Sequence, residues 1–144
     1  MVKTDSSIAK ALSRAHQALL KDLGKLEESV DSASEQDLQA LQVRLGATRA
    51  HILDHFRFEE QNGYMDKVRN REPRLERTID QLASEHRHLA QSLAVLIEKA
   101  KEAKYVDQAL RTEVRDWIAA VQQHESREDE LVQGAFNLDI GAED

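Results

Sequence analysis

Four histidines and two glutamates interrupt stripes of apolar residues that recur at helical spacing. A buried imidazole or carboxylate is costly unless something compensates for it, so polar residues inside an apolar stripe are informative. Two of the histidines stand alone. The other two each precede a glutamate by four residues, a spacing that places both side chains on one helix face. The six residues are His16, the pair His55 and Glu59, His86, and the pair His124 and Glu128.

These six side chains are expected to lie at one depth of a helical bundle. With a rise of about 1.5 Å per residue, the histidines fall about 10 to 20 Å from the same end of the bundle. Imidazoles mixed with carboxylates suit iron, manganese or zinc better than calcium or magnesium, which prefer oxygen ligands. If Glu59 and Glu128 bridge, two metals fit, each with two histidine nitrogens and two carboxylate oxygens. This arrangement leaves room for a bridging oxide or hydroxide and an exchangeable position, which favours iron and dioxygen chemistry.

Four segments with apolar residues at helical periodicity must position these side chains. Long helices joined by short loops pack antiparallel, with each apolar stripe turned toward a shared core. We therefore predict an all-α fold, an up-down-up-down four-helix bundle, in a single domain of residues 1–144 with a tail at about 135–144. The segments are residues 5–30, 34–59 with an extension past Gly63 left open, 73–104 opened by Pro73, and 107–134 capped by Asp107.

The composition restricts the class of protein. Of the 144 residues, 40% are hydrophobic and 33% are charged, with one proline and five glycines, a balance typical of helical proteins. A formal net charge of -7 disfavours nucleic acid and an acidic membrane surface as partners. The absence of cysteine excludes disulfides, thiolate metal sites and iron–sulfur clusters. The first residues lack the apolar stretch of a secretory signal, so we expect a cytoplasmic protein without a membrane span.

At the six residues the sequence resembles the hemerythrin-like family, also called the HHE cation-binding domain. That family has a helical histidine followed by HxxxE, another histidine and a second HxxxE. The segments HILDHFRFEE, SEHRHLAQSL and HESREDE look like its second, third and fourth helices. The resemblance implies that His16 and His55 serve one iron, and that His86 and His124 serve the other, with both glutamates bridging. It also implies oxygen, peroxide or nitric oxide as small ligands.

The sequence departs from the oxygen-carrying hemerythrins at two points. Those proteins place two histidines on the third helix at HxxxH spacing and end with HxxxxD. Here the residues one turn before and one turn after His86 are Leu82 and Ala90. A pair of irons with fewer nitrogen ligands has a different redox potential, so sensing, or reactivity with peroxide and oxygen, fits the pattern as well as reversible oxygen carriage.

Other polar and aromatic residues near the motif are expected to have lesser roles. His51, one turn before His55, is expected at the rim of the site more than as the missing ligand. His88 is expected to point into solvent, because it lies two residues after His86. The aromatic residues are expected to be ordinary core residues, although each could also shield the site: Trp117, Tyr64 and Tyr105. The glutamates that flank the predicted ligands are expected to be solvated unless a helix is rotated: Glu60, Glu85 and Glu125.

Two functions remain open if the chain binds metal. The first is a non-haem di-iron protein that binds or senses O2, peroxide or NO. The second is a peroxide-reducing or oxygen-activating enzyme built on the same irons. A ferritin-like ferroxidase fits less well, because it uses two ExxH motifs and the single ExxH here, Glu85 with His88, points off the core face. The alternative without metal is a helical interaction domain whose charged faces bind a partner.

Overall fold

The computed structural model describes residues 5–136, and nearly all of them are helical. This range contains no β-strand, so the all-α prediction is confirmed. The number of helices differs from the predicted four, because a short fifth helix follows the second long one. No helix in residues 5–136 combines the length and hydropathy needed to cross a bilayer. The elements are α1 (Asp5–Ser32), α2 (Leu38–Asn62), α3 (Tyr64–Arg71), the 3₁₀ turn η1 (Pro73–Leu75), α4 (Glu76–Glu102) and α5 (Gln108–Phe136).

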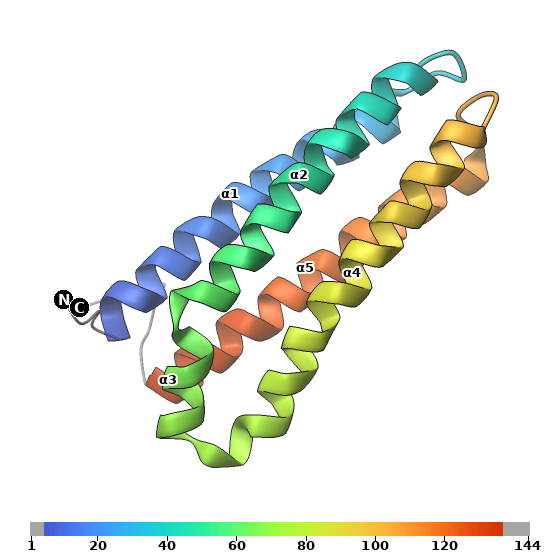
Figure 1. The fold of residues 1–144 in the computed structure, drawn as a ribbon. Helices are drawn as coiled ribbons and strands as arrows, with labels where there is room; N and C mark the ends of the chain where they lie inside the picture. The colour runs from blue at the N-terminus through green and yellow to red at the C-terminus, as the bar shows by residue number, and fades with distance from the viewer. Residues whose placement is uncertain (1–4, 137–144) are drawn as a thin grey trace.

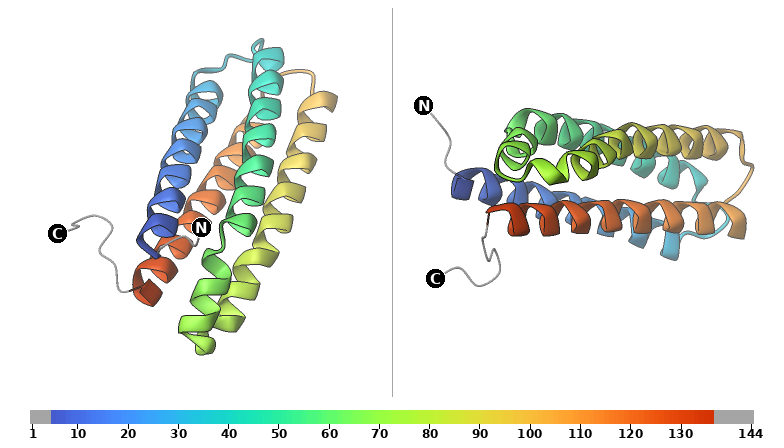
Figure 2. Two further views of the ribbon diagram at one scale, coloured as in Figure 1. Left: turned by 60° about the vertical axis from the view of Figure 1, so that its left-hand side comes forward. Right: turned by 90° about the horizontal axis from the view of Figure 1, so that it is seen from below.

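The four long helices lie side by side, and successive ones run in opposite directions (Figure 1). Helix α1 contacts α2 and α5, and α4 contacts the same two helices, so each long helix has two neighbours around a shared centre. Short loops join α1 to α2 and α4 to α5 at one end of the bundle. Helix α3 lies at the opposite end, where it contacts all four long helices (Figure 2).

The chain leaves α2 at Gly63, whose φ of 95° lies in the left-handed region that glycine adopts without a steric penalty. The second long helix therefore ends at Asn62, and the separate α3 begins with Tyr64. Pro73, expected to open the third long helix, lies in η1 instead, and α4 begins at Glu76. The break at the glycine and the proline turn together create α3.

The last long helix begins and ends close to the predicted residues. The Asp107 carboxylate accepts a hydrogen bond of 2.8 Å from the backbone N–H of Leu110, which confirms Asp107 as a cap for the first turn of α5. Helix α5 continues past Gly134 to Phe136. Of the predicted tail at about 135–144, the first two residues are therefore helical, and residues 137–144 lie outside the described residues.

Two apolar clusters fill the space between the helices. The larger one, which includes Leu19, Leu93 and Val121, occupies the half nearer the short loops. The smaller one, which includes Ile8 and Val132, occupies the half nearer α3. Along α1, α4 and α5, buried polar residues fall between the members of the two clusters. We call these residues, together with two buried residues of α2 that contact them, the polar layer: His16, His55, Glu59, His86, His124, Glu125 and Glu128.

Candidate metal centre

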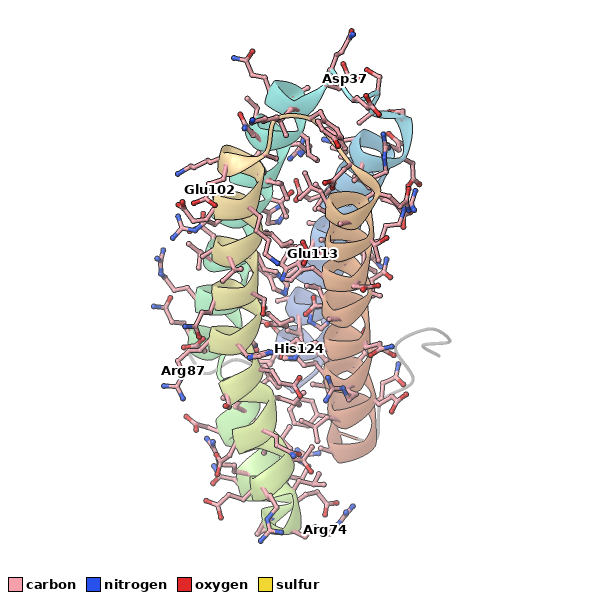
Figure 3. The ribbon with its side chains drawn as sticks, turned by 90° about the vertical axis from the view of Figure 1, so that its right-hand side faces the viewer. Asp37, Arg74, Arg87, Glu102, Glu113 and His124 are labelled. Atoms are coloured by element: carbon pink, nitrogen blue, oxygen red, sulfur yellow. The ribbon has the colours of Figure 1, made fainter. Side chains whose placement is uncertain are left out.

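The polar layer contains all six residues that the sequence predicts as metal ligands, and each is at most 4% exposed. Helix α1 contributes one histidine, α4 contributes another, and α2 and α5 each contribute an HxxxE pair. Figure 3 shows His124 between α5 and α4, directed into the bundle. The helical spacing read from the sequence therefore brings the six side chains to one level of the bundle, although their role as ligands stays a prediction.

The first group of side chains consists of His16, His55, Glu59 and Glu125, whose candidate ligand atoms all lie within 4.8 Å of one another. His16 Nε2 lies 2.7 Å from Glu59 Oε2. His55 Nε2 lies 3.2 Å from the same oxygen. Glu125 Oε1 lies 2.9 Å from His55 Nε2 and 3.4 Å from His16 Nε2. Two imidazoles and two carboxylates from α1, α2 and α5 thus converge on one point.

The second group consists of Glu59, His86, His124 and Glu128, again with ligand atoms within 4.8 Å of one another. His86 Nε2 lies 3.0 Å from Glu59 Oε1 and 3.5 Å from Glu128 Oε2. His124 Nε2 lies 3.2 Å from Glu128 Oε1. This group draws on α2, α4 and α5, so the two groups together involve every long helix.

Glu59 and Glu128 face both groups. Glu59 presents Oε2 to His16 and His55, and its other oxygen, Oε1, to His86. Glu128 presents Oε1 to His124, and that oxygen also lies 3.5 Å from His16 Nε2 in the first group. Carboxylates that face two ligand sets in this way are placed to bridge two neighbouring metal ions.

The atoms of the polar layer lie close together but are poorly paired by hydrogen bonds. Three of the four histidine Nε2 atoms, and at least one oxygen of each of its three glutamates, make no hydrogen bond. Buried polar atoms are nearly always paired in native proteins, so nitrogens and oxygens that converge on one point without well-aligned hydrogen bonds fit a bound cation. The three buried glutamates also supply negative charge that bound cations would offset.

Carboxylates at the edge of the layer orient three of the histidines. In each case Nε2 faces the centre, while Nδ1 lies within hydrogen-bonding distance of a carboxylate on another helix. This is the usual arrangement around metal-binding histidines, because it fixes the tautomer and the ring orientation. Arg127 in turn holds Glu85 through two hydrogen bonds of 2.7 and 2.9 Å. The pairs are His16 with Asp129 at 2.7 Å, His86 with Glu60 at 3.0 Å and His124 with Glu85 at 2.7 Å.

The carboxylates also control the protonation of the layer. Burial lowers the pKa of the histidines, but the neighbouring carboxylates outweigh burial and raise the pKa of His55 to about 9 and that of His86 to about 10. Burial would raise the pKa of Glu59 and Glu128, but contact with the histidines lowers both. Burial dominates at Glu125, whose pKa rises to about 7. Since a nitrogen must lose its proton before it binds a metal, higher pH favours metal uptake.

Two aromatic side chains contact the layer, one from each apolar cluster. Phe56 stacks on His86, with ring centroids 4.2 Å apart and an angle of 9° between the planes. Tyr64 is completely buried, and its hydroxyl donates a hydrogen bond to Glu128 Oε2. Burial and the charge of Glu128 raise the pKa of Tyr64, so the phenol remains a donor over the ordinary pH range. The contact between Tyr64 and a candidate ligand was not foreseen from the sequence.

The flanking residues divide into those that agree with the prediction and one that does not. Glu125 is 2% exposed, so the expectation that it is solvated is wrong. Glu60 is exposed and Glu85 is partly exposed, as expected, yet each contacts a buried histidine. His51 lies outside both groups, with Nδ1 3.7 Å from a carboxylate of α1, which agrees with a place at the rim. His88 is exposed, as expected.

One family model, described as the hemerythrin HHE cation binding domain, matches residues 7–136. The matched range includes every residue of the polar layer and all five helices except the first two residues of α1. Comparisons with curated proteins and with solved structures gave no match.

Proposed function

Because the chain belongs to the hemerythrin HHE cation-binding family, we propose that its polar layer holds two iron ions that bind or sense a small oxygen-derived ligand. One ion is assigned to each group of side chains, with Glu59 and Glu128 as bridges and an oxide or hydroxide as a third bridge. The proposed ligands are O2, peroxide and nitric oxide. Glu125 is added to the ligands of the first ion.

The shared position of Glu59 is the observation that carries this proposal. Its Oε2 atom faces His16 and His55 of the first group, and its Oε1 atom faces His86 of the second, at distances between 2.7 and 3.2 Å. A single ion would leave the histidine nitrogens of the other group buried without a cation, which is costly. Two ions give both groups a partner and offset the negative charge of the three buried carboxylates.

The protein's own residues supply binding, orientation and exclusion of water. The histidine Nε2 atoms would hold the ions, while the carboxylates at Nδ1 of three histidines keep those imidazole rings in one orientation. Tyr64 donates a hydrogen bond to Glu128 and so fixes that bridge. The apolar clusters on either side keep bulk water out of the layer. Iron, when bound, supplies a redox couple and a Lewis acid for a small oxygen ligand.

A peroxide-reducing or oxygen-activating enzyme is the second candidate, and Glu125 is the observation that favours it. An additional carboxylate at the first position gives that iron a harder and more anionic set of donors. Such donors stabilise the oxidised metal, which favours redox reactivity over reversible oxygen carriage. Turnover of hydrogen peroxide with a reductant, compared with simple ligand binding, separates the two functions.

Metal analysis of gently purified protein tests the proposal. We expect about two irons per chain and an absorption band that changes on reduction and on re-exposure to air. His55→Ala and Glu59→Ala are expected to lower the iron content and the thermal stability, since metal binding favours the folded state. His88→Ala is the matched control, because His88 is exposed and lies outside both groups.

Two outcomes would contradict a di-iron site. The first is a wild-type protein that contains no iron and takes none up under anaerobic conditions. The second is an iron content in His55→Ala and Glu59→Ala equal to that of His88→Ala. Either result would favour the metal-free interaction domain, whose stability and absorption spectrum a chelator would not change.

A further inference from the structure

Two hollows lie next to one another along the seam where α2 packs against α4. One has a volume of about 240 Å³ and the other a volume of about 290 Å³. Ala90 lines the first hollow, and Ala94, one helical turn further along α4, lines the second. We call the two hollows together the α2–α4 groove, which follows α4 for roughly 22 Å, from His86 to Lys101.

The lining of this groove is basic, although the chain is acidic. It contains four basic residues and two acidic ones, whereas the whole chain has a formal net charge of -7. Both acidic residues already have partners in the protein. Glu60 contacts His86 at 3.0 Å, and Glu98 contacts Lys101 at 3.4 Å. The hollows described between α4 and α5 have no such excess of basic residues. The basic residues of the groove are Arg49, Arg57, Arg87 and Lys101.

Two of the four basic residues have no partner in the part of the chain that the structure describes. Neither Arg49 nor Arg87 forms an ion pair or a hydrogen bond there. Figure 3 shows Arg87 pointing outward from α4. Arg57 forms an exposed ion pair with Asp54 at 3.2 Å, and such pairs contribute little, so its charge remains available as well. The groove therefore attracts an acidic surface while the rest of the chain repels it, which orients an acidic partner on this seam.

His86 connects the groove to the polar layer. Its ring lines the groove, while its Nε2 atom lies 3.0 Å from Glu59 Oε1 inside the layer. Phe56 lines the same hollow and stacks on the His86 ring, with centroids 4.2 Å apart. The hollows described between α4 and α5 are lined by none of the six predicted ligands. A single imidazole ring thus lies between the floor of the groove and the second group of side chains.

An oxidised metal centre in the layer needs electrons from outside the layer. Under either proposed function, iron that has reacted with oxygen or peroxide returns to the ferrous state only by gaining an electron. The sequence contains no cysteine, so it has no thiol that could supply electrons. A groove of this length, with four cations along it, is longer than a small organic reductant. It matches the small, charge-steered interfaces of electron-transfer proteins.

We propose that the α2–α4 groove is the docking surface for a small acidic electron-transfer protein, which reduces the metal centre through the His86 ring. The proposal rests on the proposed di-iron centre. In each encounter the donor's iron–sulfur cluster loses one electron and one ferric ion becomes ferrous, with no covalent bond formed or broken. Two encounters reduce the pair. The basic residues of the groove hold and orient the donor, and His86 gives the electron a short path.

An oxidised plant-type [2Fe–2S] ferredoxin is a suitable acidic probe for the docking step. The purified protein is titrated with it at low ionic strength, and calorimetry gives the dissociation constant. The double variant Arg49→Gln, Arg87→Gln is expected to bind about tenfold more weakly, because two cations that face the acidic surface are lost. The matched control is Arg14→Gln, Arg77→Gln. It changes the net charge equally, and both residues are exposed and lie outside the groove.

Electron transfer is measured with the same two double variants after they are loaded with iron. Reduced ferredoxin, at concentrations below the dissociation constant, is mixed with the oxidised protein in an anaerobic stopped-flow instrument, and the absorbance of its cluster gives the rate. At low salt the groove variant is expected to be reduced about tenfold more slowly than the control variant. At high salt the two rates are expected to be equal, because salt screens the attraction. The reduction potential of the irons should be the same in both, since the replaced side chains are exposed.

The outcomes distinguish a failure of this proposal from a failure of the di-iron centre. A wild-type protein without iron defeats the proposed function, and electron delivery with it. If iron is present but the groove and control variants bind ferredoxin equally, the docking surface is overturned. If the two variants bind ferredoxin differently but are reduced at the same rate at low salt, electron delivery through this groove is overturned.

Discussion

The hydrogen bond from Tyr64 to Glu128 joins the short helix α3 to the polar layer, and Tyr64→Phe removes only that bond. Phenylalanine keeps the ring in the smaller apolar cluster but leaves the completely buried Glu128 without its phenol donor. Loss of a hydrogen bond to a buried charged group costs about 2 kcal/mol. For a chain of 144 residues, we expect the midpoint of thermal unfolding to fall by roughly 6 °C.

The single tryptophan provides the assay. Trp117 is 4% exposed in the larger apolar cluster, and its indole N–H donates a hydrogen bond of 3.0 Å to the Leu89 carbonyl. Its fluorescence therefore reports unfolding of the bundle. Urea titrations of the metal-free protein, with a chelator present, give the free energy of unfolding of each variant.

Tyr105→Phe is the matched control, because Tyr105 is 50% exposed and the chain contains no other tyrosine besides Tyr64. Removing its hydroxyl is expected to leave the free energy of unfolding unchanged. If Tyr64→Phe and Tyr105→Phe unfold at the same urea concentration, the Tyr64 hydroxyl does not stabilise Glu128 and the reasoning is refuted. Since the pKa of Tyr64 is raised, the difference between the variants should also persist at mildly alkaline pH.

Three further predictions concern pH, the edge of the layer and the apolar core. Folding raises the pKa of His55 from 6.5 to about 9 and that of His86 from 6.5 to about 10. Their contribution to the stability of the metal-free protein is therefore complete below pH 6.5 and is lost as the pH rises through about 9 to 10. Urea titrations at several pH values can follow this loss. Glu85→Gln should weaken metal affinity about tenfold to a hundredfold, because it removes the carboxylate that orients the buried His124. Glu113→Gln, at an exposed ion pair with Lys99, is the control and should leave the affinity unchanged. Titration of the protein in competition with a metal chelator measures both affinities. Leu93→Ala should cost about 3 kcal/mol in urea unfolding while the iron content of the purified protein stays the same.

The sequence was sufficient to predict the four long helices and the convergence of six ligand-type side chains. These features depend on periodicity alone, because residues four apart share a helix face whatever surrounds them. Helix α3 was not predicted, since its eight residues carry too few apolar positions to define a stripe, and the left-handed turn at Gly63 separates it from α2. The contact of Tyr64 with Glu128 was missed for the same reason.

Glu125 was assigned to solvent because it is next to His124, and adjacent residues on a helix point about 100° apart. In the bundle, α5 packs between α1 and α4, so its buried face is wide. His124 turns toward α4, where it meets Glu85, and Glu125 turns toward His55 and His16. Two neighbouring residues therefore both lie inside. A single sequence defines the centre of a buried stripe, but the width of that stripe depends on how neighbouring helices are arranged.

The polar layer also determines how cooperatively the bundle unfolds. It divides the apolar interior into a larger cluster near the loops and a smaller cluster near α3, and all four long helices cross it. In the metal-free protein the smaller cluster can open while the larger one stays folded, so the backbone amides of α3 should exchange hydrogen with solvent ahead of those in the centre of α4. Bound metal would couple the two halves into one folding unit, because opening either half would then break ligand bonds. The same seven residues that give the protein its chemistry would thus decide whether it melts in one step or two.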